Sequence, residues 1–99
     1  MEVYERLAAE NPAAFEPDLA ESYNNLADFY KEVQRYNEAE QYYKRELEVY
    51  ERLAAENPAE YEPNLTKSYG KLADLYDEIQ RYEEAEQMRE RAEALKKEK

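Results

Sequence analysis

Acidic side chains are the most abundant groups in this chain that could do chemistry, because Asp and Glu number 25 against 14 Lys and Arg. Closely spaced acids such as Glu83 with Glu84, and Glu38 with Glu40, are the groups that calcium sites and carboxylate catalysis use. An EF-hand loop also needs a glycine-centred turn, and a catalytic carboxylate pair needs a pocket. These acids alternate with Arg and Lys at helical spacing, which is typical of a solvated helix face. We therefore predict no catalytic residue and no metal site.

Other chemistries are excluded by the residue types that the chain lacks. The absence of Cys and His removes their nucleophiles, the histidine bases and the thiolate and imidazole ligands of zinc. Gly70 is the single glycine, whereas phosphate-binding and dinucleotide-binding loops need at least two. The sequence therefore predicts neither an enzyme nor a cofactor.

The charge balance and the hydropathy limit the partners and the location. A net charge of -11 repels phosphate backbones and anionic membrane surfaces, so we expect no nucleic acid and no membrane. No apolar run approaches the ~18 residues of a membrane span, and the first residues lack a signal-peptide pattern. The absence of cysteine fits a reducing compartment. These features predict a soluble, cytoplasmic protein.

The 11 tyrosines invite a binding-site interpretation, since tyrosine is enriched at interfaces. Most of them recur at three-to-four-residue spacing on apolar stripes, which favours a place in the core. The predicted core tyrosines are Tyr23, Tyr30, Tyr36, Tyr69, Tyr76 and Tyr82. Tyr42, Tyr43 and Tyr50 stay open, because they form an apolar surface if no helix covers them.

A tandem repeat organises the whole chain. Residues 3–48 match residues 49–94 at 29 of 46 positions without a gap. The segment from Val3 to Ala13 recurs unchanged from Val49 to Ala59. A period of 46 residues exceeds one helix and suits a helical pair with its connection.

Prolines and apolar periodicity set the expected helix boundaries. Each Asn-Pro should end a helix, and Pro17 and Pro63 suit first-turn positions, where the missing N–H is not used. A change of apolar phase places a further break at Gln34-Arg35. The prediction is five helices, near 2–11, 17–33, 36–56, 63–79 and 82–97, and no strand. Segments 12–16 and 57–62 are the predicted connections, from which Phe15 and Tyr61 fold back onto the helices.

The repeat resembles the tetratricopeptide repeat. The family pattern of an aromatic residue, Leu, a small residue and Tyr at fixed spacing is met by Tyr23, Leu26, Ala27 and Tyr30. Ala39 and Tyr43 continue it. The second copy supplies Tyr69, Leu72, Ala73, Tyr76, Tyr82 and Ala85. The resemblance implies an all-α solenoid of tandem antiparallel helix pairs in a single domain, with a half repeat over 1–12 and repeats over 17–57 and 63–98.

The chain departs from the common form of that family in three ways. Its period is 46 residues instead of 34, which is similar to the extended repeats of kinesin light chains and of many bacterial and archaeal scaffold proteins. Gln34 and Gln80 stand where the family usually has glycine, so a positive φ there costs about 1 kcal/mol. Glu46 replaces a small alanine that returns as Ala92 in the second copy, and its carboxylate is expected to be either exposed or paired.

The resemblance also implies a function, because such proteins bind peptides or other proteins along the concave surface lined by the first helix of each pair. The predicted groove residues are Glu21, Asn24, Asn25, Asp28, Lys31, Lys67, Lys71 and Asp74, with Glu32, Gly70, Asp77 and Glu78 at matching positions. Chaperone-binding members place part of a clamp for a peptide's terminal carboxylate where Asn25, Lys67 and Lys71 fall. Two ammonium groups and an amide donor converging from adjacent helices can satisfy a carboxylate.

A second hypothesis from another class is that the chain is a self-assembling structural element. Two helical pairs fall below the three or more repeats usually needed for stability. The short helix over 2–11 would cover only part of the first pair, and the identical Val49–Ala59 segment of another molecule could cover the same surface. We expect a homo-oligomer that strengthens with salt. At the other end, Arg89 and Glu93 replace Tyr43 and Leu47, so a polar outer face of the last helix is expected.

Overall fold

The computed structural model describes residues 12–97, with side chains described for residues 15–96. This part of the chain forms four α-helices in tandem and no strand. The helices are α2 (Pro12–Glu32), α3 (Tyr36–Glu56), α4 (Pro58–Glu78) and α5 (Tyr82–Lys97). The all-α prediction is confirmed here with four helices instead of five, and the predicted helix over 2–11 lies outside the described residues.

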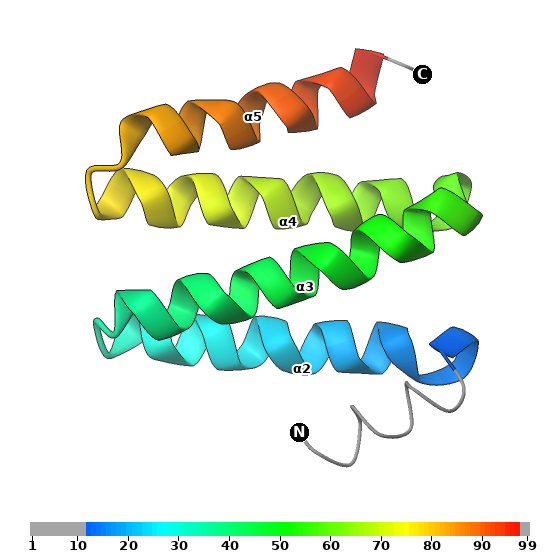
Figure 1. The fold of residues 1–99 in the computed structure, drawn as a ribbon, viewed down its shortest axis with the longest axis horizontal. Coiled ribbons are helices and arrows are strands. Elements are labelled where there is room, and N and C mark those ends of the chain that lie inside the picture. Colours follow the sequence, from blue (N-terminus) through cyan, green and yellow to red (C-terminus); the bar gives the residue numbers. More distant parts are fainter. Residues whose placement is uncertain (1–11, 98–99) are drawn as a thin grey trace.

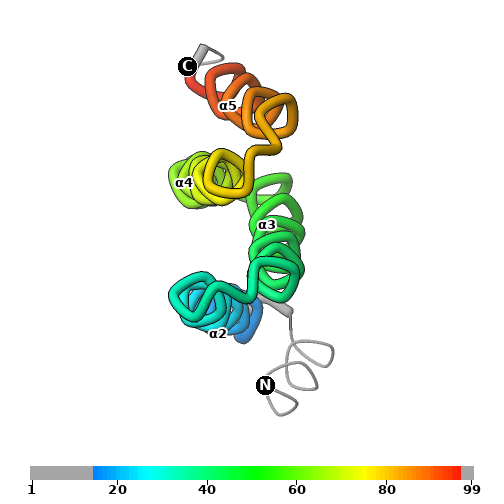
Figure 2. The backbone as a smooth tube through the Cα atoms, turned by 90° about the vertical axis from the view of Figure 1, so that its left-hand side faces the viewer, coloured from blue at the N-terminus to red at the C-terminus, as the bar shows by residue number. Residues whose placement is uncertain are grey.

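Consecutive helices run antiparallel and lie side by side (Figure 1). Each helix packs against the next one along the chain. Seen end-on, α2 and α4 form one layer while α3 and α5 form the other (Figure 2). The Cα atoms extend over 38 × 36 × 14 Å, so the thickness matches two layers of helices whose axes lie about 8–10 Å apart.

The two segments predicted as connections, 12–16 and 57–62, are helical except at Asn57, so that prediction is wrong at every other position of these segments. Pro12 and Pro58 begin α2 and α4, whereas Pro17 and Pro63 lie inside these helices. Proline at the first position loses no hydrogen bond, because that N–H has no partner inside the helix. An internal proline costs about 3 kcal/mol. Burial offsets this cost, because a continuous helix puts Tyr61 and Leu65 on one face, against the core.

In the turn within each helix pair, a glutamine adopts the left-handed backbone conformation. Gln34 has a φ of 64° and Gln80 a φ of 65°. Arg35 N–H donates to the carbonyl of Tyr30 at 2.8 Å, and Gln34 N–H donates to that of Lys31 at 3.0 Å. This is the Schellman pattern, which the second pair repeats with Arg81 on Tyr76 and Gln80 on Asp77. The break predicted at Gln34-Arg35 is therefore present, the chain folds back there, and the positive φ falls on a non-glycine residue.

Small residues bring the helices close together. Ala27, Ala39, Ala73 and Ala85 have no exposed surface, and two of them come from each repeat. Large side chains fill the space beside them, since Tyr43 and Leu72 are only 1% exposed. Interiors packed to this density keep apolar contacts that a looser arrangement would lose. Phe15 and Tyr61 pack against this core as predicted, although from within helices.

The burial of the tyrosines differs from the prediction at one position. Tyr23, Tyr69 and Tyr76 are buried, while Tyr30 and Tyr36 are partly buried. Tyr82 was expected in the core, but it is 61% exposed. Its repeat partner Tyr36 lies against the first helix of the following pair, and α5 has no such neighbour in the described structure. Of the tyrosines left open, Tyr43 and Tyr50 are buried, and Tyr42 is partly buried.

We expect Gln34→Gly and Gln80→Gly each to stabilise the chain, since glycine adopts the left-handed conformation without a side-chain clash. The expected gain is about 0.5 to 1 kcal/mol per turn, after the extra chain entropy that glycine loses on folding. Urea denaturation followed by circular dichroism measures it. The matched control, Gln41→Gly, lies at an exposed position inside α3 and should lose about 1 kcal/mol. A loss in the turn variants as large as in this control would contradict the expectation.

Candidate partner-binding groove

A groove runs between α2 and α4, with α3 beneath it in the other layer (Figure 2). We call it the α2–α4 groove, and it contains two cavities. The floor cavity has a volume of about 290 Å³ and is lined by Glu21, Asn24, Glu46, Tyr50, Asn64, Lys67, Ser68 and Lys71. The turn cavity, of about 400 Å³, is lined by Asp28, Lys31, Glu32, Gln34, Tyr36 and Glu78.

Two polar bridges cross the groove from α4 to α2. Lys71 donates a hydrogen bond to Asn24 Oδ1, and its Nζ lies 3.9 Å from Asp28 Oδ2. Lys31 Nζ lies 3.8 Å from Glu78 Oε2 nearer the turns. Because these side chains are partly exposed, each ion pair contributes only about 0–1 kcal/mol to stability. The bridges therefore leave the groove free to exchange its own contacts for those of a ligand.

Six of the eight predicted groove residues line the two cavities, and two do not. Glu21, Asn24, Lys67 and Lys71 line the floor cavity, while Asp28 and Lys31 line the turn cavity. Asn25 is exposed and lines neither of them, so Asn24 is the amide that faces Lys71. Asp74 interacts with α5, where its Oδ1 lies 3.6 Å from Arg89 Nη2. Asn25 is the repeat counterpart of Lys71, which turns from α4 toward α2, so the same orientation turns Asn25 away from α4.

Asp28 joins the three helices that form the groove. It accepts a hydrogen bond from the hydroxyl of Tyr43 on α3, and it also faces Lys71 on α4. Burial first, and then the hydrogen bond to Asp28, raise the pKa of Tyr43 well above its usual range. The phenol therefore stays protonated and remains the donor. Its ring fills the core beneath the groove, so Asp28 is held at a fixed place in the groove wall.

Glu46 lies beneath the floor cavity, and its environment differs from both alternatives expected for it. Glu46 is only 5% exposed, and no ion pair or hydrogen bond satisfies its Oε1 atom. This oxygen is therefore neither solvated nor hydrogen-bonded. α3 places it between α2 and α4, where the second repeat has the small Ala92. An unsatisfied buried polar group costs about 1–3 kcal/mol, and a charged one costs more.

The electrostatics of the floor cavity follow from this burial. Desolvation raises the pKa of Glu46 to about 7, against an ordinary value of 4.5. Lys71 and Lys67 lower that pKa, whereas Asp28 raises it further. The lysines therefore act on Glu46 at a distance without forming an ion pair. Near neutral pH the carboxyl group divides between its protonated and ionised forms.

Ser68 is a second unsatisfied group in the same cavity. It is 1% exposed, and its hydroxyl oxygen has no hydrogen-bond partner. Sequence reasoning missed Ser68 as a site residue, together with Asn64 and Tyr50. For Ser68 a signal existed, because the copies share this serine as Ser22, at a position among residues that form the core. The repeat alone showed that the position is constrained, and the fold shows that it opens onto a cavity.

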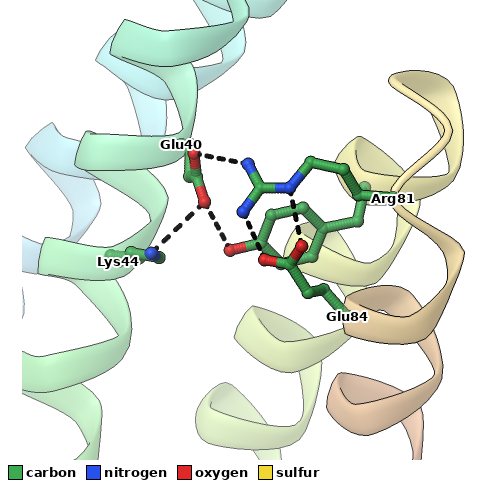
Figure 3. Close-up of polar contacts among 5 residues, drawn as sticks. Glu40, Lys44, Arg81 and Glu84 are labelled. Atoms are coloured by element: carbon green, nitrogen blue, oxygen red, sulfur yellow. Dashed lines mark hydrogen bonds and ion pairs between the residues drawn. The ribbon is translucent and has the colours of Figure 1, made fainter.

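A second polar cluster lies at the turn end of the molecule and ties the two pairs together (Figure 3). Glu40 Oε1 accepts from Arg81 Nη1 at 3.0 Å, and its Oε2 accepts from the Tyr76 hydroxyl at 2.7 Å. Lys44 Nζ lies 3.2 Å from Glu40, and Arg81 also pairs with Glu84. Partial burial raises the pKa of Glu40, but the bonds from Tyr76, Arg81 and Lys44 outweigh it and hold that pKa below its usual value. Every member is satisfied, so the cluster is structural.

Two other kinds of site are not found in the part of the chain that the structure describes. Residues 12–97 contain no group of three or more acidic side chains arranged to hold a metal ion. None of the four helices combines the length and the apolar character that a membrane crossing requires.

The helix pairs and the small residues between them define a helical repeat protein. A family model of the tetratricopeptide repeat matches residues 18–98, and the chain belongs to this family. Tetratricopeptide repeats generally mediate protein–protein interactions. Neither the curated proteins nor the solved structures gave a match.

We expect Glu46→Met to stabilise the chain by about 1–3 kcal/mol at pH 8, because a side chain of similar length replaces an unsatisfied carboxylate. The gain should shrink at pH 5. The folded-state pKa is raised from 4.5 to about 7, so the contribution of Glu46 is most favourable at low pH and is lost as the pH rises through 7. That difference corresponds to roughly 3 kcal/mol at most.

Urea denaturation of both proteins at pH 5 and pH 8 measures these free energies. Glu48→Met, at an exposed position on the same helix, is the matched control and should change stability by less than about 0.5 kcal/mol at either pH. A gain for Glu46→Met that is the same at both pH values would show that Glu46 is ionised or neutral throughout.

Proposed function

We propose that this chain is a protein-interaction module that holds a segment of a partner protein in the α2–α4 groove. The observation that carries the proposal is the pair of cavities between α2 and α4, over buried polar groups that nothing in the described structure satisfies. A partner that supplies hydrogen bonds there recovers the desolvation cost of those groups. The family supports the same interpretation, since its repeats mediate protein–protein interactions.

The charge of the groove favours a basic partner segment. The cavities are lined by five acidic residues and three lysines, and Lys31 and Lys71 already face acids across the groove. Lys67 is the one lysine of this set without an ion pair in the described structure. The whole chain carries a charge of -11, which steers cationic partners toward it at low salt. A helix of 21 residues is about 31 Å long, so the groove spans about nine extended residues.

Fluorescence anisotropy with labelled twelve-residue peptides of net charge -3, 0 and +3 tests the groove. We expect the affinity to rise with positive charge and to fall with added salt. Asn64→Trp, which fills the floor cavity from α4, should weaken binding at least tenfold. Gln87→Trp, at an exposed position of α5 outside both cavities, is the control and should bind normally. No binding by any peptide, or equal binding to the Asn64→Trp variant, would refute the groove.

The same titration decides whether the groove recognises a chain end. In the clamp suggested by the family, Lys67 and Lys71 hold a terminal carboxylate and Asn25 assists them. Free-acid and amidated versions of each peptide separate this clamp from binding along the segment. If the clamp operates, the amidated peptides bind more weakly and Lys67→Ala removes the difference.

Self-assembly is a second candidate function, favoured by an uncovered apolar face of α2. Phe29 is 54% exposed and Val33 is 49% exposed. Their repeat counterparts are covered in the second pair, where Leu75 is fully buried and Ile79 is partly buried against the core. The first helix of the second pair, α4, is covered by α3 of the first pair, so a helix from another copy would cover α2 in the same way.

If self-assembly operates, the molar mass from light scattering should exceed the 11.9 kDa of one chain and rise with concentration and salt. Salt strengthens the association because it screens the repulsion between acidic copies. Phe29→Asp with Val33→Asp should return the mass to that of one chain. Gln41→Asp, which adds a charge at an exposed position of α3, should leave the assembly in place. A constant monomer mass from micromolar to millimolar concentration would contradict this second function.

A further inference from the structure

The floor cavity contains two acceptor groups that the protein itself leaves unsatisfied. Glu46 on α3 is 5% exposed and Ser68 on α4 is 1% exposed, and both line the cavity. Neither Glu46 Oε1 nor Ser68 Oγ has a hydrogen-bond partner. The great majority of buried polar atoms in proteins are paired, so a ligand that brings donors to this cavity wall would gain hydrogen bonds that the protein does not supply.

The two lysines of the cavity do not supply these donors. Lys71 is engaged with Asn24 and Asp28 on α2, and Lys67 forms no ion pair with Glu46. The acids Glu21 and Glu46, with Asp28 beside them, outnumber the two lysines. With Glu46 ionised, the two acids and two lysines of the lining balance, and Asp28 beside them adds one negative charge, so the site favours a cation over an anion.

We propose that the floor cavity is a subsite for one arginine side chain of the bound partner segment, whose guanidinium group donates hydrogen bonds to Glu46 and Ser68. The inference rests on the groove function proposed above. A guanidinium has five N–H donors in a planar fork, so one group can serve a carboxylate and a hydroxyl together, whereas an ammonium is a compact point charge. A volume of about 290 Å³ lies just below the ~300–1000 Å³ of small-molecule pockets, and it suits a single side chain.

The repeat shows that the carboxylate is an addition to the fold. The second copy has Ala92 at the position of Glu46, and the first copy therefore carries a buried acid where the same architecture accepts a methyl group. A residue that lowers the stability of the fold, because no group of the protein pairs with it, is typical of binding sites. Ser68 is shared by both copies as Ser22, so Glu46 is what distinguishes this cavity within the repeat.

Arginine binding at this subsite depends on pH, because it depends on the ionisation of Glu46. The groups that face Glu46 are Asp28 on α2, Lys67 and Lys71 on α4, and the neutral phenols of Tyr43 and Tyr50 on its own helix, while Glu21 of α2 lines the same cavity. With a pKa of about 7 in the free protein, Glu46 is mostly protonated at pH 6 and mostly ionised at pH 8. A guanidinium binds the ionised form. The affinity should therefore be about tenfold weaker at pH 6 than at pH 8.

The test uses the peptide of net charge +3 with one central arginine, and versions in which citrulline or lysine replaces that arginine. Citrulline keeps the shape of arginine but carries no charge. At pH 8 and fixed ionic strength we expect the citrulline peptide to bind at least tenfold more weakly and the lysine peptide to lie between them. Glu46→Gln should remove the preference for arginine and flatten the pH profile, while Glu48→Gln should leave both unchanged. Ser68→Ala, which should cost about threefold in affinity, serves if Glu46→Gln does not fold.

The outcomes separate the subsite from the groove. If all three peptides bind equally well and the Asn64→Trp variant still blocks them, the groove stands and the arginine subsite is refuted. If Glu46→Gln keeps both the preference and the pH dependence, Glu46 is not the recognition group. If no peptide binds, the groove function fails and the subsite fails with it.

Discussion

Close approach of the helices at alanine is the constraint on which the rest of this structure depends. Ala27 and Ala39 in one pair, and Ala73 and Ala85 in the other, have no exposed surface. The chain has little apolar material, with 39% charged residues, so it can hold together only if few side chains make many contacts. Because the helices stand so close, anything larger placed between them is deprived of water. Glu46 is in that position, and its unusual chemistry follows from the same packing that stabilises the fold.

The periodicity predicted the helix pairs well because the apolar stripes and the small residues repeat at a fixed spacing. It failed where local preference and burial compete. Pro17 and Pro63 disfavour a helix, yet the apolar residues around them gain more from staying on a helical face. Tyr82 shows the opposite limit, since its sequence context matches that of Tyr36 and only the absence of a following helix in the described structure leaves it exposed.

The sequence pattern predicted which helix faces line the groove, but it did not predict the two cavities. The repeat pattern assigns whole helix faces, and Glu21, Lys67 and Lys71, which it assigns to one face, all line the floor cavity. Choosing between Asn24 and Asn25 needs the rotation of α2 about its axis to within one residue, and a sequence pattern does not fix that rotation. Glu46 attracted notice only as a departure from the family, because its lack of a hydrogen-bond partner is a property of three helices together.

The polar cluster around Glu40 sets how the two helix pairs are oriented (Figure 3). At one end of the groove the pairs are joined covalently through Asn57, the single residue between α3 and α4. At the other end they are joined by Glu40, whose bonds reach Tyr76 and Arg81 of the second pair. With both ends fastened, this ionic contact acts on the twist from one pair to the next together with the apolar packing of α3 against α4. In a longer array of such pairs, the superhelical pitch would therefore respond to salt.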